Sequence, residues 1–379
     1  MNRHHIPPRL RWLLVAALAA SAPIRAEITI GSTYSVSGAN SAIGLAVKNT
    51  MEVLPDTVGG QPFRIIALDD AGQAATATGN MRKMTDEDKV DVVIGGSSIA
   101  TCIGLADIAA AKKTAQICLA PAPIRNPWIF SVAPSIPMMV NGAIEHMRAN
   151  GVKTVAYIGF SDNWGDQHFQ ALLDGLNNTG IKVITNERYA RTDTTINPQI
   201  LKVIASGPTA VFVGAAGPNA ALPSIALAER GYKGRVYHSH AAVGPEFLKS
   251  GGKTLEGVIA PTQPFIVAQQ LPDSNPVKGA ALEYAKRYQE RFGAGTLTPE
   301  GAYLWDAYAW LNAAVPVAMF RGKPGTPEFR EALRDALENL KDVVGTHAVY
   351  SLGPDNHIGV DRRGRVMVRV EKGAFRIIP

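Results

Sequence analysis

The stretch VVIGGSSIATCIGLA, residues 92–106, combines a short apolar run, two glycines, two serines and a segment able to form a helix. This order is typical of a buried parallel strand that turns directly into a helix. Small ligands bind at such turns because the helix N-terminus offers free backbone N–H groups. The stretch therefore predicts an α/β fold with a polar or anionic ligand held near the serines.

The alternation of strand and helix runs along the chain and then begins again. Strands are expected at 27–34, 63–69, 90–94 and 115–119, with helices near 43–53, 75–85 and 100–112. A second set has strands at 154–159, 181–189, 210–214 and 235–238, with helices near 164–178, 197–206 and 220–230. Short, nearly all-apolar strands are covered on both faces and are joined by right-handed crossovers. The pattern predicts two doubly wound parallel-sheet lobes.

A proline-rich joint at 119–137 separates the two sets. The remaining segments have no complete core of their own: helices near 276–292, 300–320 and 326–340, then strands at 346–351, 365–370 and 374–378. They must dock onto the two lobes, so the chain crosses between the lobes more than once. We expect lobe 1 to comprise 27–143 and 265–345, and lobe 2 to comprise 144–264 and 346–379. Two such lobes joined by a hinge enclose a cleft that can close.

The first 26 residues have the pattern of a secretory signal peptide. A basic segment precedes an apolar core, Trp12 to Ala20, which is too short to span a bilayer. Cleavage is expected after Ala26, with Ala22 as the alternative, and the absence of a nearby cysteine argues against a lipid anchor. Without residues 1–26 the formal charge falls from +6 to +2. The basic precursor therefore gives no indication of nucleic-acid binding.

The two cysteines, Cys102 and Cys118, are expected at the same edge of one parallel sheet. An exported protein meets an oxidising compartment, so a disulfide is permitted, and two buried free thiols are the alternative. The histidines lack the spacing of zinc ligands. No metal or other cofactor is expected.

The sequence contains no recognisable catalytic centre. The turn at Gly95 and Gly96 lacks the third glycine of a dinucleotide site and the Gly-Lys-Ser/Thr of a phosphate loop. The serines that follow lack the nucleophile elbow of hydrolases. Asp69 and Asp70 have the residue types of an acid/base pair, but adjacent acids at a strand end more often cap helices and bind loop amides. We therefore expect a binding protein rather than an enzyme.

Four segments together resemble the type I periplasmic solute-binding proteins of the branched-chain amino acid ABC transporter family. They are VVIGGSSIATCIGLADIAA at 92–110, NPWIFSVAPS at 126–135, SDNWGDQ at 161–167 and GGKTLEGVIAP at 251–261. Their order and spacing carry the resemblance, which covers nearly all of 27–379. It implies a hinged periplasmic receptor, monomeric as the family is, that delivers a small-molecule ligand to a membrane permease.

In that family the ligand carboxylate is held by the serine turn of lobe 1 and by the loop after the next strand. The resemblance carries these roles over to one turn and one loop of this chain: Ser97, Ser98 and Ile99, and Ala120, Pro121 and Ala122. Hydroxyls and free amides at a helix N-terminus bind an anion without a buried cation. An ordinary helix cap is the alternative role for each serine.

The chain departs from the family pattern in lobe 1 and at the aromatic positions. Ile99 replaces a serine and Ala122 a threonine, so the carboxylate must be held by Ser98 and backbone amides. Trp164 replaces a tyrosine, where its ring either stacks on a flat ligand or packs at the hinge. Ala215 lies near the position of an aromatic residue that closes on the amino-acid backbone, which leaves room for a bulkier ligand.

The departure with the largest consequence is Ala241, which falls where the family has an acid for the ligand ammonium. His240 precedes it, and the nearest carboxylate in sequence is Glu246. A buried ammonium without a counter-charge is costly. The predicted ligand is a carboxylate without an amino group, aromatic like a benzoate or phenylpropenoate. A receptor for a branched-chain amino acid or a keto acid is the alternative. His238 or His240 would donate to a distal hydroxyl, and Tyr34 is a further candidate wall. A ligand sensor and an exported enzyme are the rival functions.

Overall fold

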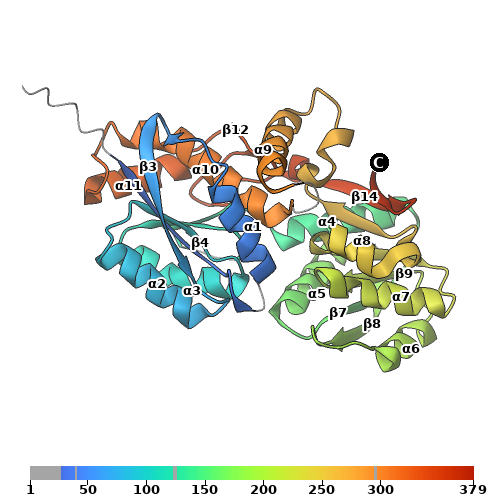
Figure 1. The fold of residues 1–379 in the computed structure, drawn as a ribbon. Coiled ribbons are helices and arrows are strands. Elements are labelled where there is room, and N and C mark those ends of the chain that lie inside the picture. The colour runs from blue at the N-terminus through green and yellow to red at the C-terminus, as the bar shows by residue number, and fades with distance from the viewer. Residues whose placement is uncertain (1–26, 39–40, 123–125, 294–296) are drawn as a thin grey trace, which may run out of the picture.

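The computed structural model describes residues 27–38, 41–122, 126–293 and 297–379. Figure 1 shows two α/β lobes side by side, each built around its own sheet. The predicted signal peptide, 1–26, lies outside the described residues and stays a prediction. In the described ranges no helix is long and apolar enough to cross a membrane. The two-lobed α/β architecture expected from the sequence is confirmed.

The first sheet has six strands in the order β2-β3-β1-β4-β5-β6. Their bounds are β1 Ile28–Tyr34, β2 Thr57–Val58, β3 Gln61–Asp69, β4 Val92–Gly95, β5 Ala115–Cys118 and β6 Ile129–Ser131. The central strand β1 pairs in parallel with both β3 and β4, so the strand order reverses there. Such a reversal opens a crevice at the carboxyl ends of the two strands.

Helices from distant parts of the chain cover the two faces of this sheet. One face carries α2, Ala74–Asp86, and α3, Ile99–Ala111. The other packs against α10, Pro299–Ala318, and α11, Pro327–Glu338, in a core that joins Ile30 and Ile94 to Trp310 and Leu333. The helix α1, Ser41–Met51, lies beside α10. Lobe 1 is therefore completed by residues from the last quarter of the chain.

The second sheet has seven strands in the order β15-β14-β11-β10-β9-β7-β8. Their bounds are β7 Thr154–Phe160, β8 Lys182–Tyr189, β9 Ala210–Gly214, β10 Arg235–His238, β11 Ile259–Thr262, β14 Val366–Glu371 and β15 Ala374–Ile378. The helices of this part are α4 Ile136–Ala149, α5 Asn163–Leu176, α6 Asn197–Ala205, α7 Ala221–Glu229 and α8 Pro245–Gly251. Strands β14 and β15 extend the sheet in antiparallel fashion beside β11, so the end of the chain docks as the sequence predicts.

Two elements lie inside the stretch read from the sequence as a proline-rich joint. The strand β6 and the start of α4 both fall within 119–137. Ser135 caps α4 by accepting from the Met138 N–H, and Pro137 stands in the first turn. A proline is tolerated there because the first N–H groups of a helix have no intrahelical acceptor. The residue boundaries of the two lobes stay a prediction.

The predicted strand at 346–351 is shorter than expected because backbone N–H groups at its start donate to a buried carboxylate instead of to a neighbouring strand. Only Val349–Tyr350 forms a strand, β13, paired with β12, Val343–Val344. Asp306 of α10 accepts from the Thr346 N–H at 2.5 Å and the Tyr350 hydroxyl at 2.6 Å. The His347 ring stands 3.0 Å from the same carboxylate. This cluster fixes residues 346–350 to α10, while α9, Pro276–Phe292, packs nearby against residues 264–270.

The structure resolves the alternatives for the two cysteines. Cys102, in the first turn of α3, and Cys118, at the end of β5, form a disulfide, with their Cα atoms 5.8 Å apart. Both belong to the carboxyl edge of the first sheet. The bond therefore ties the start of α3 to the neighbouring strand beside the serine turn.

Candidate functional site

The candidate site lies at the carboxyl ends of the parallel strands, where both sheets reverse their strand order. In the first lobe this edge carries the turn after β4 and the loop after β5. In the second lobe it carries the start of α5 after β7 and the turns after β9 and β10. Ligands of open α/β sheets bind at such edges.

The serine turn begins with a glycine that no other residue can replace easily. Gly96 has φ +84°, and a Cβ built there would lie 2.7 Å from the backbone of Cys102. The buried Ser97 hydroxyl is 3.0 Å from that of Ser35, which donates to Asp70 at 2.6 Å. Because a carboxylate only accepts, the Ser35 proton goes to Asp70 and the Ser97 proton to Ser35. Ser97 is left with acceptor lone pairs.

Ser98 caps a helix, and a cap uses the hydroxyl oxygen as an acceptor, so the hydroxyl proton can still be donated to a ligand. Its hydroxyl accepts from the Thr101 N–H at 3.2 Å, and the Thr101 side chain accepts from the Ser98 N–H at 3.1 Å. This capping box begins α3. By helix geometry, the next N–H groups, those of Ile99 and Ala100, have no intrahelical acceptor and are therefore able to donate to an anion.

Asp69 and Asp70 also have the structural role favoured from the sequence. Asp69 accepts from the N–H groups of Val36 and Ala71 at 3.0 and 2.9 Å, and Asp70 accepts from Gly72 at 2.9 Å. The hydrogen bond from the Ser37 side chain, with those from the loop amides, lowers the pKa of Asp69. The two acids hold the loops after β1 and β3.

The remaining lobe 1 residues of the predicted site are mostly buried. Ala120 and Ala122 are 5% and 4% exposed, and the Ala122 N–H donates to the Ala120 carbonyl at 2.8 Å. Pro121 between them is partly exposed. Tyr34 ends β1 within the core shared with α10, and its backbone carbonyl accepts from the Asp70 N–H. The loop therefore offers mainly apolar surface.

In the second lobe, the helix α5 begins with a cap that places Trp164 in its first turn. Asp162 accepts from the N–H groups of Trp164 and Gly165 at 3.0 and 3.2 Å. The Asp162 carboxylate is also 2.5 Å from the Arg191 guanidinium. Its charge is thus matched by the helix N-terminus and by an arginine.

Three aromatic rings gather at this point. The Trp164 ring lies 4.4 Å from that of His168 and 5.5 Å from that of His240, and the two imidazoles are 5.7 Å apart. Burial lowers the pKa of His168 to about 4 and that of His240 to about 3, so both are neutral at pH 7. His168 was missed from the sequence, although it stands one helical turn after Trp164.

The structure separates His238 from this cluster. His238 ends β10 with its Nε2 atom 2.7 Å from the Ser224 hydroxyl of α7, and its ring packs against Phe247 of α8. His238 is the last residue of β10 and enters the core under these helices, whereas His240 lies beyond the strand end, in the turn that follows. Near this edge Ser239 donates to the Ala215 carbonyl at 2.5 Å.

Ala241 lies in the turn after β10, where its carbonyl accepts from the Gly217 N–H at 3.0 Å. This bond ties the turns after β9 and β10 together. Glu246, the carboxylate nearest to Ala241 in sequence, is exposed in the first turn of α8. Neither residue supplies a buried negative charge to the Trp164 cluster.

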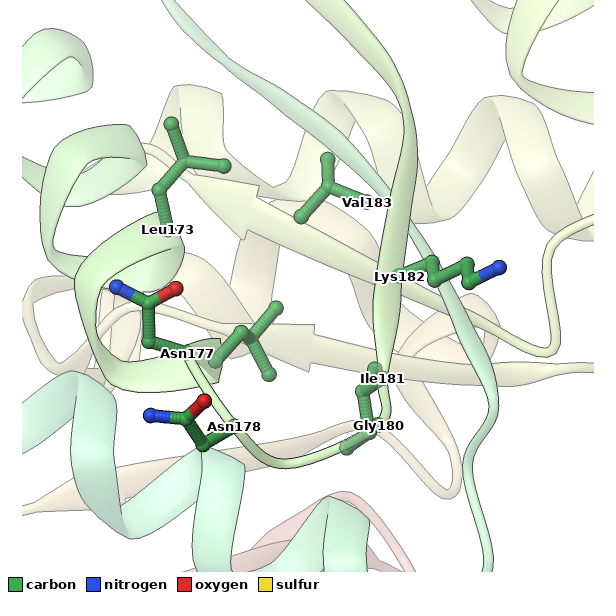
Figure 2. Close-up of a pocket in the computed structure, with 8 residues that line it drawn as sticks. Leu173, Asn177, Asn178, Gly180, Ile181, Lys182 and Val183 are labelled. Carbon is green, nitrogen blue, oxygen red and sulfur yellow. The ribbon is translucent and has the colours of Figure 1, made fainter.

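Two surface hollows lie away from these residues. One is formed at the turn between α5 and β8, where Figure 2 shows Leu173, Asn177 and Lys182 around it. It is at the amino end of β8, the edge opposite to the candidate site. Within the ranges that the structure describes, no three His, Cys, Asp or Glu side chains are grouped to hold a metal ion.

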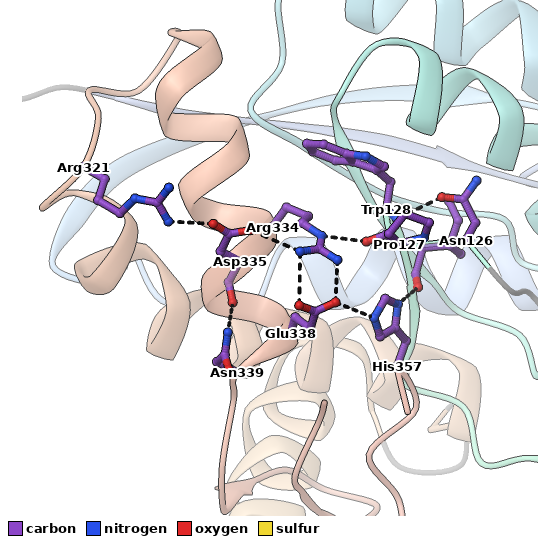
Figure 3. A network of polar contacts seen from close by, with 10 residues as sticks. Asn126, Pro127, Trp128, Arg321, Arg334, Asp335, Glu338, Asn339 and His357 are labelled. Carbon is purple, nitrogen blue, oxygen red and sulfur yellow. Dashed lines mark hydrogen bonds and ion pairs between the residues drawn. The ribbon is translucent and has the colours of Figure 1, made fainter. Parts of the chain in front are cut away.

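The second hollow borders the polar network of Figure 3 on α11. Arg334 donates to the Pro127 carbonyl at 2.8 Å and is paired with Glu338. His357 bridges Glu338, at 3.2 Å, and the Ile129 carbonyl, at 2.7 Å. These bonds hold α11 and the segment around His357 against β6 and the connection that precedes it.

A family model described as periplasmic binding protein matches residues 27–374. The chain belongs to this family. Among the receptors it resembles are two crystal structures of extracellular ligand-binding receptors from Rhodopseudomonas palustris HaA2. One is 38% identical with a TM-score of 0.86, the other 36% identical with a TM-score of 0.88. Each alignment covers 93% of this chain and 100% of the other.

More distant relatives agree on the fold of the receptor. The leucine-binding protein LivK from Thermotoga maritima is 19% identical, with a TM-score of 0.75 over 93% of this chain and 98% of that one. An amino acid binding protein from Pseudomonas aeruginosa is 22% identical over 78% of this chain and 79% of its own length. The chain is thus a periplasmic binding protein, a ligand receptor of the periplasmic or extracellular space, and it shares the two-lobed fold of LivK.

Proposed function

We propose that this receptor captures an aromatic acid between its two lobes and delivers it to the permease of an ABC importer. The carboxylate is held at the start of α3, by the Ser98 hydroxyl and the N–H groups of Ile99 and Ala100. Ser97 contributes little to this grip because its proton is directed to Ser35. The ring stacks on Trp164, with His240 beside it.

The observation that carries the proposal is the neutral surface of lobe 2 where an amino-acid receptor needs a negative charge. Ala241 occupies the position of the family acid, and the adjacent imidazoles are neutral. On α5 and its cap, Asp162 and Asp166 are paired with Arg191 and Arg188. An ammonium group buried here would have no counter-charge, so the free energy of binding an α-amino acid is unfavourable.

The ring of an aromatic acid fits the same surface for a positive reason. Trp164 is partly exposed and offers a flat apolar face, while Ala215 and Ala241 in the neighbouring turns are small. Stacked aromatic pairs contribute about 0.5–1.5 kcal/mol beyond the burial of their area. A benzoate or phenylpropenoate gains this contact, and an aliphatic ligand gains only the burial term.

A thermal-shift panel tests the ligand class. A ligand that binds only the folded receptor raises its melting temperature. Benzoate and cinnamate are expected to stabilise the protein, whereas leucine, isoleucine and valine are expected to leave the melting temperature unchanged. Strong stabilisation by the amino acids alone would refute the argument from Ala241.

An amino-acid or keto-acid receptor is the second candidate function, because the Pseudomonas aeruginosa relative is described as an amino acid binding protein. The same panel separates the two candidates. Recovery of the bound acid unchanged after long incubation would exclude turnover by an enzyme. We further propose that residues 1–26 are a cleaved signal peptide and that the mature receptor is a monomer.

A further inference from the structure

The disulfide between Cys102 and Cys118 joins the start of a helix to the end of a strand, at the edge of the first sheet where the proposed function places the ligand carboxylate. Cys102 stands in the first turn of α3, the helix that Ser98 caps, and Cys118 ends β5. The parallel pairing of β4 with β5 ends at Ile94 and Ile117. The disulfide therefore continues the connection between the two segments past the end of the sheet ladder.

The strand end of this cross-link is firmly held. Cys118 is paired with Ser131 of β6, and its carbonyl accepts from the Val132 N–H at 3.3 Å. The helix end has no strand beside it, since α3 begins directly after the serine turn. The disulfide thus attaches the first turn of α3 to an ordered part of the sheet.

Contacts around the disulfide reach the backbone on both sides of it. The Cys102 sulfur lies 3.2 Å from the Gly96 carbonyl oxygen, which accepts from the Leu119 N–H at 3.3 Å. The Gln116 side-chain amide donates to the Cys102 carbonyl at 3.1 Å, and its nitrogen lies 3.2 Å from the Cys118 sulfur. Both cysteines and Gln116 are fully buried, so water does not compete for these contacts. A displacement of the serine turn therefore disturbs the end of β5 as well.

We infer that this disulfide is a positioning element of the ligand site, which holds the N–H groups at the start of α3 in the orientation that binds the carboxylate. The inference rests on the proposed function, which assigns the carboxylate to Ser98 and to the N–H groups of Ile99 and Ala100. A segment that is ordered before the ligand arrives loses little conformational entropy on binding, so the preorganised site binds more tightly. Without the disulfide, the cost of ordering this turn offsets part of the binding free energy.

A disulfide that only stabilises the fold has different consequences. It acts mainly by restricting the unfolded chain, so its loss lowers the free energy of unfolding and leaves the affinity of the folded receptor unchanged. A positioning role predicts two further effects of its loss. The backbone N–H groups around the serine turn exchange faster in the folded, ligand-free protein, and the affinity for the ligand falls.

The first measurement is amide hydrogen exchange on the ligand-free protein, for the wild type and for Cys102→Ser/Cys118→Ser. The Thr101 N–H, bonded to the Ser98 hydroxyl, and the Leu119 N–H report on the two sides of the disulfide. Their exchange in the double variant is expected to be roughly tenfold faster. The rates are taken relative to an amide in lobe 2, the Gly217 N–H, which is bonded far from the disulfide in sequence.

Tyr350→Phe is the matched control for lost stability. It removes the hydrogen bond from Tyr350 to the buried Asp306 and keeps the disulfide, so it destabilises the protein without touching the serine turn. Its Thr101 and Leu119 amides are expected to keep the wild-type rates relative to the same reference amide.

The second measurement is calorimetric titration of the three proteins with benzoate and with cinnamate. The Kd of the acid that binds the wild type is expected to rise roughly tenfold in the double variant and to stay unchanged in Tyr350→Phe. An equal rise in both variants would assign the effect to stability and overturn the inference.

The remaining outcomes separate this inference from the proposed function. Unchanged exchange at Thr101 and Leu119, or faster exchange with an unchanged Kd, would overturn the positioning role and leave the aromatic-acid receptor standing. Binding of neither acid to the wild type would overturn both. If the serine pair does not fold, which its melting curve shows, Cys102→Ala/Cys118→Ala replaces it, and failure of both pairs to fold would assign the disulfide to folding and refute the inference.

Discussion

Mild acid should destabilise this protein well before its carboxylates titrate, because three buried histidines are neutral in the folded state. Burial lowers the pKa of His168 to about 4 and those of His238 and His240 to about 3. In the unfolded chain each titrates near 6.5. As the pH falls below about 6.5, the unfolded state takes up protons that the folded state does not. The stabilising contribution is therefore present above this pH and is lost as the pH falls toward 4.

The size of the effect follows from the linkage relation. Between pH 7 and about pH 5.5, each such histidine lowers the free energy of unfolding by about 1.2 kcal/mol, roughly 4 kcal/mol for the three. His146, whose pKa is lowered by burial and by the nearby Arg369 and Arg235, adds in the same direction.

Urea unfolding at several pH values across this range measures the loss directly. His238→Phe, which removes one titrating ring from under α7 and α8, should reduce the pH-dependent loss by about a third. A free energy of unfolding that stays constant from pH 7 to about pH 5.5 would refute the reasoning, since it would mean that these rings are already solvated or protonated in the folded protein.

Three further predictions concern single contacts. Trp164→Ala should weaken an aromatic ligand by about 1–3 kcal/mol in calorimetry, through lost apolar and stacking contact; an unchanged affinity would assign Trp164 to hinge packing. Replacing Cys102 and Cys118 by serine should lower the free energy of unfolding by about 2–4 kcal/mol, because the bond closes a loop with a sequence separation of 16. Wild type with reductant is the control, and equal stability of oxidised and variant protein would contradict this. Tyr350→Phe should cost about 1.5–3 kcal/mol in urea unfolding, because it removes a hydroxyl bonded to the buried Asp306; an unchanged midpoint would show that the carboxylate is satisfied without it.

The repeated strand–helix units could be predicted because their strands are short apolar runs. Such runs indicate a buried strand whatever the rest of the chain contributes. The helix α4 was missed, because the prolines at 134 and 137 indicated a linker. A proline in the first turn of a helix is well tolerated, so proline content alone does not exclude a helix there. The strand at 346–351 was also expected to be longer than it is, since the competition of Asp306 for those backbone groups depends on a contact 40 residues away.

The candidate site was predictable only where residues adjoin in sequence. The serine turn and Trp164 stand out because each follows a strand directly. His168 and His240 meet through the order of β7, β9 and β10 in the sheet, which the sequence does not reveal. His238 and His240 are two residues apart, and the strand end between them sends one into the core and leaves the other at the edge.

The late segments that complete both lobes also constrain how the chain can fold as it is made. Lobe 1 lacks the cover of α10 and α11 until residue 338 has emerged, and the second sheet lacks β14 and β15 until the last fourteen residues, 366–379, are present. Contacts of such long range close slowly, because large loops must be ordered first. A nascent chain of this protein therefore stays incompletely folded until Ile378, the end of β15, has been synthesised.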